Sequence, residues 1–513
     1  MKKKGFVYLV GAGPGDTGLM TLRGAEVMAR ADVVVYDALV NADLLRLAPR
    51  EAEIIFGGKR AKCRSIPQGE KNQLLVEKAC EGKIVVRLKG GDPYIFGRGA
   101  EEAEELAAAG IPFEVVPGVS SISAVPNYAG VPLTHRELSS GFTVITGHEH
   151  SDKPEDAVDW AQVAATPGTK VVMMATERMG EIARRLMAHG MPPKTPVAMV
   201  RWGTTGQQQS IDGTLATIGE LVTRAGFRAP SVTVIGEVVR LRDRLNWFEK
   251  RPLFGQRVVV TRARDQAGDF ARQFAELGAE VLEIPTIKIV PPEQKENLKD
   301  AMLALNEYDW IIFTSTNGVT EFFNYFFKAF DDMRDIGGPR IAAVGPSTAA
   351  KLREMHLKVD VMPKEYLASE IVRALTAYQS IENVRILLLR AEVANPDLPR
   401  ELEKCGAIVD DVACYRTVPE TEDISGAAAR LIEAGADWVT FTSGSTVACF
   451  HERFNLPELK SKYPKMRLAS IGPETSKAIR NLKLEPDVEA REHTTDGLVA
   501  ALIKATKSKS KGA

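Results

Sequence analysis

Residues 6–24, FVYLVGAGPGDTGLMTLRG, set a short apolar run against a glycine-rich turn. The run is typical of a buried β-strand, and glycines at its end let the backbone approach a ligand closely. A dinucleotide loop, G-x-G-x-x-G, uses its third glycine for close helix–strand packing and binds pyrophosphate at the helix N-terminus. Here Asp16 takes the place of that glycine, and Pro14 removes a backbone donor. The turn therefore disfavours pyrophosphate and favours a ligand with a cationic centre and an adenosine body; a plain tight turn is the alternative.

Length and charge limit what the protein can be. A chain of 513 residues is too long for one hydrophobic core and predicts about two to four domains. The net charge of -1 gives no general attraction to nucleic acid or to an acidic membrane surface. No apolar stretch approaches the roughly 20 residues of a membrane span.

The cysteines and the two ends of the chain indicate a cytoplasmic protein. Five scattered cysteines without a C-x-x-C motif predict reduced thiols rather than a disulfide frame. The opening MKKKGFVYLV is interpreted as the start of the first strand, because its apolar run is too short for an export signal. The final residues, 506–513, are small and basic and are predicted to be disordered.

Short β-branched runs alternate with helical stretches along the whole chain, which predicts an α/β protein. The charged segment 240–257, RLRDRLNWFEKRPLFGQR, separates two halves, and the chain restarts at its end with the strand-like run RVVVTRA. We therefore predict one domain over residues 1–245 and a second over residues 251–505.

The second half contains an internal repeat. DWIIFTSTNGV at residue 309 recurs as DWVTFTSGSTV at residue 437, an offset of 128 residues, and two further pairs of segments have offsets of 128 and 127. This half is therefore two similar α/β units. Each unit has two strand-to-turn junctions, F-T-S-x-x-x-V and G-P-x-T, where backbone N–H groups and hydroxyls can face a ligand. The alternative is that these hydroxyls only cap the next helix.

A second glycine-rich cluster supports the interpretation of the first turn. RLKGGDPYIFGRGAEE, residues 87–102, contains two glycines that permit close backbone approach, and Asp92 can accept hydrogen bonds from an amine or a ribose. With VGAGPGD, VVYDALV, FGGKR, PGVSS, GVPLTHR, WGTTGQQ and APSVTVIGEVV, in order across residues 6–239, it resembles the tetrapyrrole methylases, most closely the uroporphyrinogen-III C-methyltransferases. Through the looser motifs FTSTNGV, VGPSTA, CYRT and FTSGST, the second half resembles the uroporphyrinogen-III synthases.

The methylase resemblance implies a two-subdomain α/β fold that binds S-adenosylmethionine in the cleft between the subdomains and releases S-adenosylhomocysteine. The family's cofactor contacts fall on Pro14, Gly90, Gly91, Asp92, Ile95, Ser120, Ser121, Met174 and Gly203. The family usually has Tyr-Met-Gly where this chain has Met-Met-Ala, residues 173–175. A core methionine is therefore the alternative for Met174.

The same resemblance implies a proton acceptor at Asp37 and a proton donor at Lys59. A pyrrole carbon that attacks a sulfonium methyl group must lose a proton to restore conjugation, so a base within hydrogen-bond reach would help. The alternatives are a helix cap for Asp37 and a solvated or carboxylate-binding lysine for Lys59. Arg98 and Glu101 form a second candidate pair, in which Arg98 would hold a substrate carboxylate.

The substrate implied by the resemblance carries eight carboxylates, so a nearly neutral protein must gather cations at the mouth of its site. An ordinary charged surface is the alternative. The candidates for this contact are Lys59, Arg60, Lys62, Arg64, Arg98, His135 and Arg136. His148 and His150 have no evident third ligand, so we predict no metal.

The synthase resemblance implies a two-unit α/β fold that closes hydroxymethylbilane to a ring while inverting its last pyrrole. Tyr415 matches a tyrosine favoured there as a general acid or orienting group, and a hinge tyrosine is the alternative. In the family fold the chain crosses between units twice, which would group residues 251–287 with 415–505 and leave 288–414 apart. The candidate carboxylate donors are Thr314, Ser315, Thr348, Thr442, Ser443 and Thr475.

Together the two resemblances imply a bifunctional cytoplasmic enzyme of sirohaem and cobalamin synthesis. It would make uroporphyrinogen III and methylate it at C2 and C7 to give precorrin-2. The alternatives are a methylase of a later corrin intermediate fused to the synthase, and a non-catalytic protein that binds tetrapyrrole and cofactor. The expected partners are the tetrapyrrole substrates and a second copy of the chain joined through the methylase half, without nucleic acid or membrane.

Overall fold

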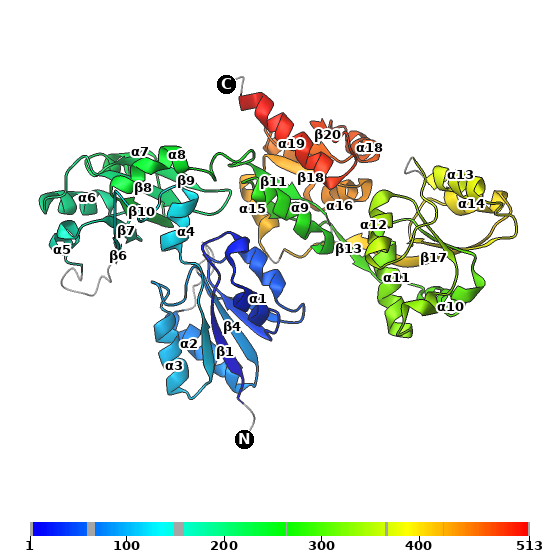
Figure 1. Ribbon diagram of the computed structural model, residues 1–513, viewed down its shortest axis with the longest axis horizontal. Helices are drawn as coiled ribbons and strands as arrows, with labels where there is room; N and C mark the ends of the chain where they lie inside the picture. The colour runs from blue at the N-terminus through cyan, green and yellow to red at the C-terminus, as the bar shows by residue number, and fades with distance from the viewer. Residues whose placement is uncertain are drawn as a thin grey trace.

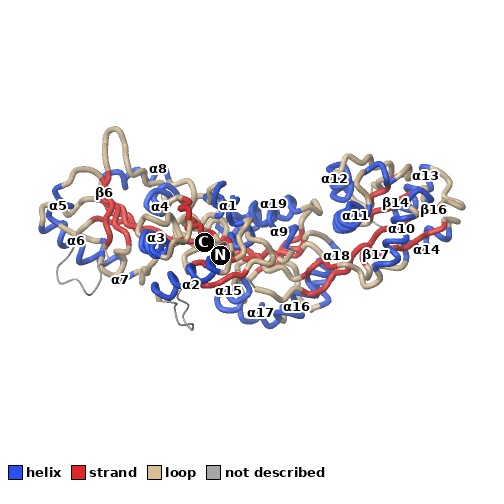
Figure 2. Tube along the Cα trace, turned by 90° about the horizontal axis from the view of Figure 1, so that it is seen from below, coloured by secondary structure: helices blue, strands red, loops and turns tan. Residues whose placement is uncertain are grey.

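The computed structural model describes residues 4–58, 67–147, 158–262, 264–364, 368–423 and 425–510. They form four five-stranded sheets with helices packed against them. In Figure 1 the second, third and fourth units follow one another from left to right, and the first unit lies below them, between the second and the third. Figure 2 shows the molecule elongated along the same horizontal axis when it is seen from below. The mixed α/β class predicted from the alternating runs is confirmed.

The first unit, residues 6–128, has a fully parallel sheet in the order β3-β2-β4-β1-β5. Its central strands β1, β2 and β4 are mostly buried, because both faces of the sheet are covered. Val85 belongs to the core on one face, and Val86 belongs to the core on the other. The elements are β1 (Phe6–Gly11), α1 (Leu22–Met28), β2 (Val33–Tyr36), β3 (Glu53–Phe56), α2 (Gln68–Cys80), β4 (Ile84–Lys89), α3 (Gly99–Ala108), β5 (Phe113–Val116) and α4 (Ser121–Tyr128).

The second unit, residues 142–245, has a mixed sheet in the order β6-β7-β10-β8-β9. Strand β10 is antiparallel to both β7 and β8, and its Val232 pairs with Met173 and with Val200. The carboxyl ends of β7 and β8 therefore lie at the same edge. The elements are β6 (Phe142–Thr146), α5 (Trp160–Ala165), β7 (Thr169–Met173), α6 (Met179–Ala188), β8 (Pro196–Arg201), β9 (Gln209–Thr214), α7 (Ile218–Arg224), β10 (Ser231–Ile235) and α8 (Arg242–Leu245).

The third unit, residues 257–283 with 427–510, has a parallel sheet in the order β12-β11-β18-β19-β20. Its core lies on both faces of β11, where Val258 and Val259 point in opposite directions. The elements are β11 (Arg257–Val260), α9 (Arg264–Glu276), β12 (Glu280–Glu283), α15 (Ala427–Ala434), β18 (Trp438–Phe441), α16 (Gly444–Phe454), α17 (Leu456–Lys462), β19 (Arg467–Ser470), α18 (Pro473–Asn481), β20 (Val488–Glu489) and α19 (Thr495–Ser510).

The fourth unit, residues 287–419, has the strand order β13-β17-β16-β14-β15, in which only β13 is antiparallel to its neighbour. Phenylalanines of one helix pack against each other and against Phe313 to form much of its core. The elements are β13 (Ile287–Val290), α10 (Lys295–Leu303), β14 (Trp310–Phe313), α11 (Thr316–Ala329), β15 (Arg340–Ala343), α12 (Pro346–Glu354), α13 (Ala368–Tyr378), β16 (Arg385–Ala391), α14 (Asp397–Lys404) and β17 (Ile408–Pro419).

The chain passes between the third and fourth units twice, after β12 and after β17. The predicted boundary at residue 415 differs from the structure, because β17 continues to Pro419 and pairs there with Ile287 of β13. Residues 415–419 therefore belong to the fourth unit.

The C-terminal segment also differs from its prediction. Helix α19 runs through residues 506–510, where the composition predicted disorder. Its earlier turns are anchored by the buried Leu498 and Leu502, and a formed helix extends at little cost, since each added residue gains a backbone hydrogen bond. Within the described ranges, no helix combines the length and apolar character needed to cross a bilayer.

Candidate active sites

Two glycine-rich turns of the first unit lie side by side at the carboxyl ends of β1 and β4. The N–H of Gly13 donates to the carbonyl of Gly91 (3.2 Å), and the N–H of Gly91 donates to the carbonyl of Gly13 (2.7 Å). The parallel register leads to this pairing, because Gly11 lies beside Lys89 at the strand ends. Gly13 and Gly91 both have positive φ angles, 75° and 69°, where a side chain would be strained. The two motifs thus form one surface.

A third turn, after β5, packs against the other two without room for a side chain. A Cβ on Gly118 would lie 2.3 Å from the carbonyl oxygen of Gly91 and 2.7 Å from the Cα of Gly11. Only glycine fits this meeting point of three strand ends, because the atoms that a side chain would meet belong to the backbone and cannot rotate away.

We expect Gly118→Ala to destabilise the first half by about 1–3 kcal/mol, as overpacking does, and to displace the turn at Gly91. Denaturant unfolding followed by circular dichroism measures the loss. Gly69→Ala is the matched control, because a Cβ there meets nothing within 4 Å. Equal unfolding midpoints for Gly118→Ala and the unchanged protein would contradict the prediction.

The turns after β1, β4 and β5 hold all predicted cofactor contacts of the first unit. A Cβ on Gly91 would lie 3.8 Å from the nitrogen of Ser121, and one on Gly90 would lie 3.2 Å from the Cβ of Leu39. The turn after β2 therefore joins the same surface. The predicted cofactor contacts on these turns are Pro14, Gly90, Gly91, Asp92, Ile95, Ser120 and Ser121.

The loop after β8 brings the second unit to this surface. The N–H of Asp16 donates to Thr204 Oγ1 (3.1 Å), and a Cβ on Gly15 would lie 2.6 Å from Thr205. Gly203 lies in the same loop, against Val125. Gly203, a predicted contact on the second unit, is therefore brought close to the turns of the first.

Large apolar side chains remain exposed around these turns. Their exposed fractions lie between 40% and 53%. Met174, at the end of β7, has a positive φ of 54° and is among them, so the alternative of a core methionine is wrong. Exposed apolar side chains in a set of turns are typical of a binding surface. The residues are Leu39, Tyr94, Ile95, Phe96 and Met174.

Three polar groups of the motifs shape the turns. Asp16 accepts hydrogen bonds from the N–H of Gly18 (2.8 Å) and from the hydroxyl of Tyr128 (2.7 Å). Asp92 accepts from the N–H groups of Tyr94 (2.8 Å) and Gly118 (3.0 Å). Ser120 caps α4. Each carboxylate oxygen of Asp92 keeps a second lone pair, so a ligand can still bind there.

Asp37 ends β2 next to this surface, with its side chain 26% exposed. Both of its oxygens accept hydrogen bonds from one guanidinium nitrogen of Arg87, at 2.8 and 2.7 Å. No helix begins at Asp37, so the alternative of a helix cap is wrong. Arg87 holds the carboxylate in place while one side remains open to solvent.

The remaining predicted catalytic and substrate-binding residues of the first half either lie on the surface or fall outside the described residues. Arg98 and Glu101 pair with each other on the surface (2.9 and 2.5 Å), so a substrate carboxylate would have to displace Glu101. Arg136 is exposed. Lys59, Arg60, Lys62 and Arg64 lie outside the described residues, as do His148 and His150. Among the described residues, no cluster of histidine, cysteine and carboxylate side chains is placed to hold a metal.

In the second half, Tyr415 of β17 contacts the first F-T-S junction. Its hydroxyl lies 2.9 Å from Ser315 Oγ, and its side chain is 6% exposed. Burial raises the pKa of Tyr415, although the hydrogen bond to Ser315 lowers it in part. The phenol is therefore neutral near pH 7 and can donate a hydrogen bond.

The remaining hydroxyl candidates serve the fold directly in this conformation. Ser315 and Ser443 each cap the helix that follows, as the alternative reading held. Thr314 donates to the carbonyl of Leu389 (3.3 Å). Thr348 and Thr475 are only 3% exposed, so a bound carboxylate would reach little of either side chain. Thr442, which is partly exposed, precedes Ser443 at the end of β18.

Two family profiles match the two halves of the chain. Tetrapyrrole (Corrin/Porphyrin) Methylases match residues 7–219, and Uroporphyrinogen-III synthase HemD matches residues 268–500. Porphyrin biosynthesis protein HemD of Ruminiclostridium josui is 36% identical over 500 residues, which cover 98% of this chain and 98% of that protein. The chain is a tetrapyrrole methylase fused to a uroporphyrinogen-III synthase.

Two further relatives are methyltransferases. A uroporphyrinogen-III C-methyltransferase of Bacillus subtilis (strain 168) is 38% identical over 341 residues, 66% of this chain and 70% of that protein. A crystal structure of uroporphyrin-III C-methyl transferase from Thermus thermophilus, complexed with S-adenyl homocysteine, is 39% identical, covers 46% of this chain and 100% of that one, and has a TM-score of 0.40.

A buried charge network supports Asp37 in the methylase half. Arg87, 1% exposed, donates from Nε to Glu102 (3.0 Å) as well as to Asp37. Glu102 is fully buried and also pairs with Lys89 (2.9 Å). Burial lowers the pKa of Arg87, but Glu102 and Asp37 raise it overall. Burial lowers the pKa of Lys89, and also that of Lys71, whose ammonium lies 3.9 Å from Asp37.

The motif reading missed Arg87, Lys89 and Glu102 as a unit. A signal was present, because Arg87 and Lys89 are charged residues on one face of the otherwise apolar run IVVRLK. Charges on a buried strand are rare unless they are paired. Their partner on α3 could not be identified from the sequence.

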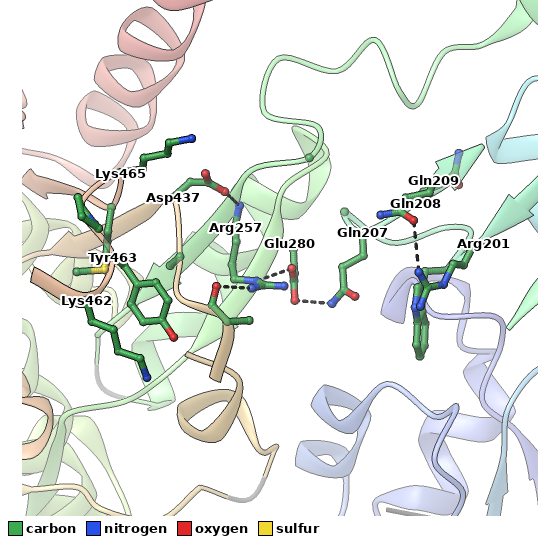
Figure 3. Close-up of a pocket in the computed structure, with 17 residues that line it drawn as sticks. Arg201, Gln207, Gln208, Gln209, Arg257, Glu280, Asp437, Lys462, Tyr463 and Lys465 are labelled. Carbon is green, nitrogen blue, oxygen red and sulfur yellow. Dashed lines mark hydrogen bonds and ion pairs between the residues drawn. The ribbon is translucent and has the colours of Figure 1, made fainter. Parts of the chain in front are cut away.

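A cavity of about 780 Å³ lies where the methylase and synthase halves meet (Figure 3). It is lined by the loop after β8 and by the amino-terminal edge of the third unit, including Arg257 and Asp437. Thr442 and Ser443 follow the opposite, carboxyl edge of that sheet. We therefore assign neither reaction to this cavity.

Proposed function

We propose that the synthase half closes hydroxymethylbilane to uroporphyrinogen III and that the methylase half methylates this product at C2 and C7 to precorrin-2, with S-adenosylmethionine as the donor. The paired turns at Gly13 and Gly91 carry the proposal, because they form a tight, uncharged backbone surface beside Asp37. A pyrophosphate would need free N–H donors, whereas both of these N–H groups are used.

The residues around the turns fit an adenosine attached to a charged sulfur. The exposed apolar side chains Ile95 and Met174 would cover a flat base, and Asp92 would accept from a ribose or an amine. S-adenosylmethionine supplies a methyl group on a positively charged sulfur. Alignment of this group with the pyrrole carbon can lower the barrier by several kcal/mol, about 7 at best.

We assign the proton transfer to Asp37. The pyrrole carbon that accepts the methyl group must lose its proton, and Asp37 presents a carboxylate that is partly open to solvent. Arg87 keeps that carboxylate in place through hydrogen bonds to both of its oxygens. In the synthase half, the neutral phenol of Tyr415 would donate a proton to the hydroxyl group of the bilane, which then leaves as water.

The direct test supplies purified protein with hydroxymethylbilane and S-adenosylmethionine and follows the products by mass spectrometry. We expect a tetrapyrrole that carries two added methyl groups. Two molecules of S-adenosylhomocysteine should be released for each ring. Uroporphyrinogen III without methylation would contradict the methylase assignment. Methylation of a later corrin intermediate in a panel of tetrapyrroles, but not of uroporphyrinogen III, would favour the alternative substrate.

Tyr415→Phe removes only the phenolic hydroxyl, and we expect the synthase rate to fall by about 10²-fold, the lower range for general acid catalysis. Ser315→Ala is the matched comparison, because it removes the partner of Tyr415 and keeps the phenol. We expect it to have a smaller effect. Chromatography of the ring isomers measures both variants, and an unchanged rate for Tyr415→Phe would leave this tyrosine as a hinge residue.

A further inference from the structure

The glycine turn of the methylase half, residues 13–16, is connected to one short segment of the synthase half, residues 277–283, by three separate routes. The first passes through the loop after β8. Thr204 accepts from the N–H of Asp16, and Gly206 packs so closely that a Cβ would lie 2.1 Å from the nitrogen of Glu280. Gln207 donates to Glu280 (2.5 Å), as Figure 3 shows.

The second route passes through the 3-10 helix η2 (Ala42–Leu47). Asn41 donates from its side chain to the carbonyl of Gly15 (2.8 Å) and also caps this helix. Arg46, in the last turn, pairs with Glu283 at the end of β12. The side chain of Glu283 is 8% exposed and that of Arg46 is 31% exposed, so the pair is partly shielded from water. A shielded pair of this kind is screened little by salt.

The third route is a row of aromatic rings. The hydroxyl of Tyr128 donates to Asp16 (2.7 Å), and its ring lies 4.9 Å from that of Phe248. The ring centroids of Phe248 and Phe254 lie 5.6 Å apart. Phe254 packs against Gly278, because a Cβ on Gly278 would lie 3.2 Å from the Cα of Phe254. Rings at these spacings are in mutual contact, so the row is continuous.

We propose that strand β12 of the synthase half positions the glycine turn of the methylase half, so that the synthase half is part of the support of the cofactor site. The inference rests on the proposed function, because it takes residues 13–16 as cofactor-binding. A turn held before the ligand arrives loses less conformational freedom on binding, which improves affinity. Coupling between sites of this kind typically changes affinity by about 5–150-fold.

Charge reversal at the Arg46–Glu283 pair tests the inference on the full chain. Arg46→Glu and Glu283→Arg each replace the attraction across the two halves by a repulsion, and the double variant restores opposite charges there. Arg46→Glu also breaks the pair with Asp43 (2.9 Å) inside the methylase half, so the single variant Glu283→Arg is the cleaner of the two. Calorimetry with S-adenosylhomocysteine measures affinity, and hydrogen exchange of residues 11–16 without ligand measures the order of the turn. Synthase activity of the same samples reports that the second half is folded. Arg240→Glu is the matched control, since Arg240 is exposed and pairs with Glu237 on the surface.

We expect each single reversal to weaken S-adenosylhomocysteine binding about tenfold and to speed exchange in the turn, while the double variant returns both close to the unchanged protein. Unaltered affinity and exchange in both single variants would overturn the inference. A double variant as weak as the singles would also overturn it. Failure of the unchanged protein to bind S-adenosylhomocysteine would instead count against the proposed function, and the exchange measurement would still decide the mechanical coupling.

Discussion

Asp37→Asn is expected to lower the rate of methyl transfer by about 10²–10⁴-fold, the usual contribution of a positioned base. Asparagine has nearly the same shape and still offers one oxygen to Arg87, and Arg87 keeps its second partner, Glu102. The network therefore stays in place while the base is removed. We expect unchanged binding of S-adenosylhomocysteine, so the loss should fall on kcat rather than on cofactor affinity.

Steady-state methylation of uroporphyrinogen III measures this effect, with the synthase activity of the same protein as an internal control. Glu26→Gln, which neutralises an exposed carboxylate of the same unit, should methylate normally. A rate for Asp37→Asn within about threefold of the unchanged protein would remove Asp37 from the chemistry. The proton would then have to leave by another group, and Lys71, which lies 3.9 Å from Asp37, would be the next candidate to test.

Glu102→Ala is expected to produce the largest loss of stability. Glu102 is fully buried between Arg87 and Lys89, and its removal leaves two cations without their shared partner. Breaking a buried pair in this way costs about 3–5 kcal/mol, because an uncompensated charge remains in a medium of low polarity. The effect should appear in the unfolding transition of the methylase half.

Urea unfolding gives the measurement, and Glu101→Ala gives the control from the neighbouring position of α3. Glu101 is exposed and pairs with Arg98 at the surface, so its loss should cost no more than about 1 kcal/mol. Because the protein has several domains, the methylase transition must be resolved from that of the synthase half. Similar midpoints for the two variants would show that the buried network contributes little.

The glycine turns are the part of the site that the sequence predicts best. Gly13, Gly91 and Gly118 stand where positive φ angles or close backbone contact exclude other residues, and such requirements are local. Their spacing after apolar runs also predicts that they follow β1, β4 and β5 at one edge of a sheet. The resemblance to known families then assigned the ligand, which no turn geometry can do alone.

The synthase site shows the opposite case. Ser315 and Ser443 fit both a ligand-binding and a capping role in the sequence, and the structure shows the caps. The contact between Ser315 and Tyr415 joins residues 100 positions apart, so no local pattern contains it. The end of β17 was misplaced for a related reason, since only its pairing with β13 extends it to Pro419.

The sequence by itself determined the strand-and-turn units, their division into two halves and the residues that fill the turns, because these depend on backbone restrictions and apolar periodicity along the chain. The tertiary structure alone decided that Arg87 holds Asp37 while Glu102 holds Arg87, and that β12 lies against the loop after β8. Both are contacts between distant segments. Their free energy depends on burial and on partner distance, which exist only after the sheets and helices have packed.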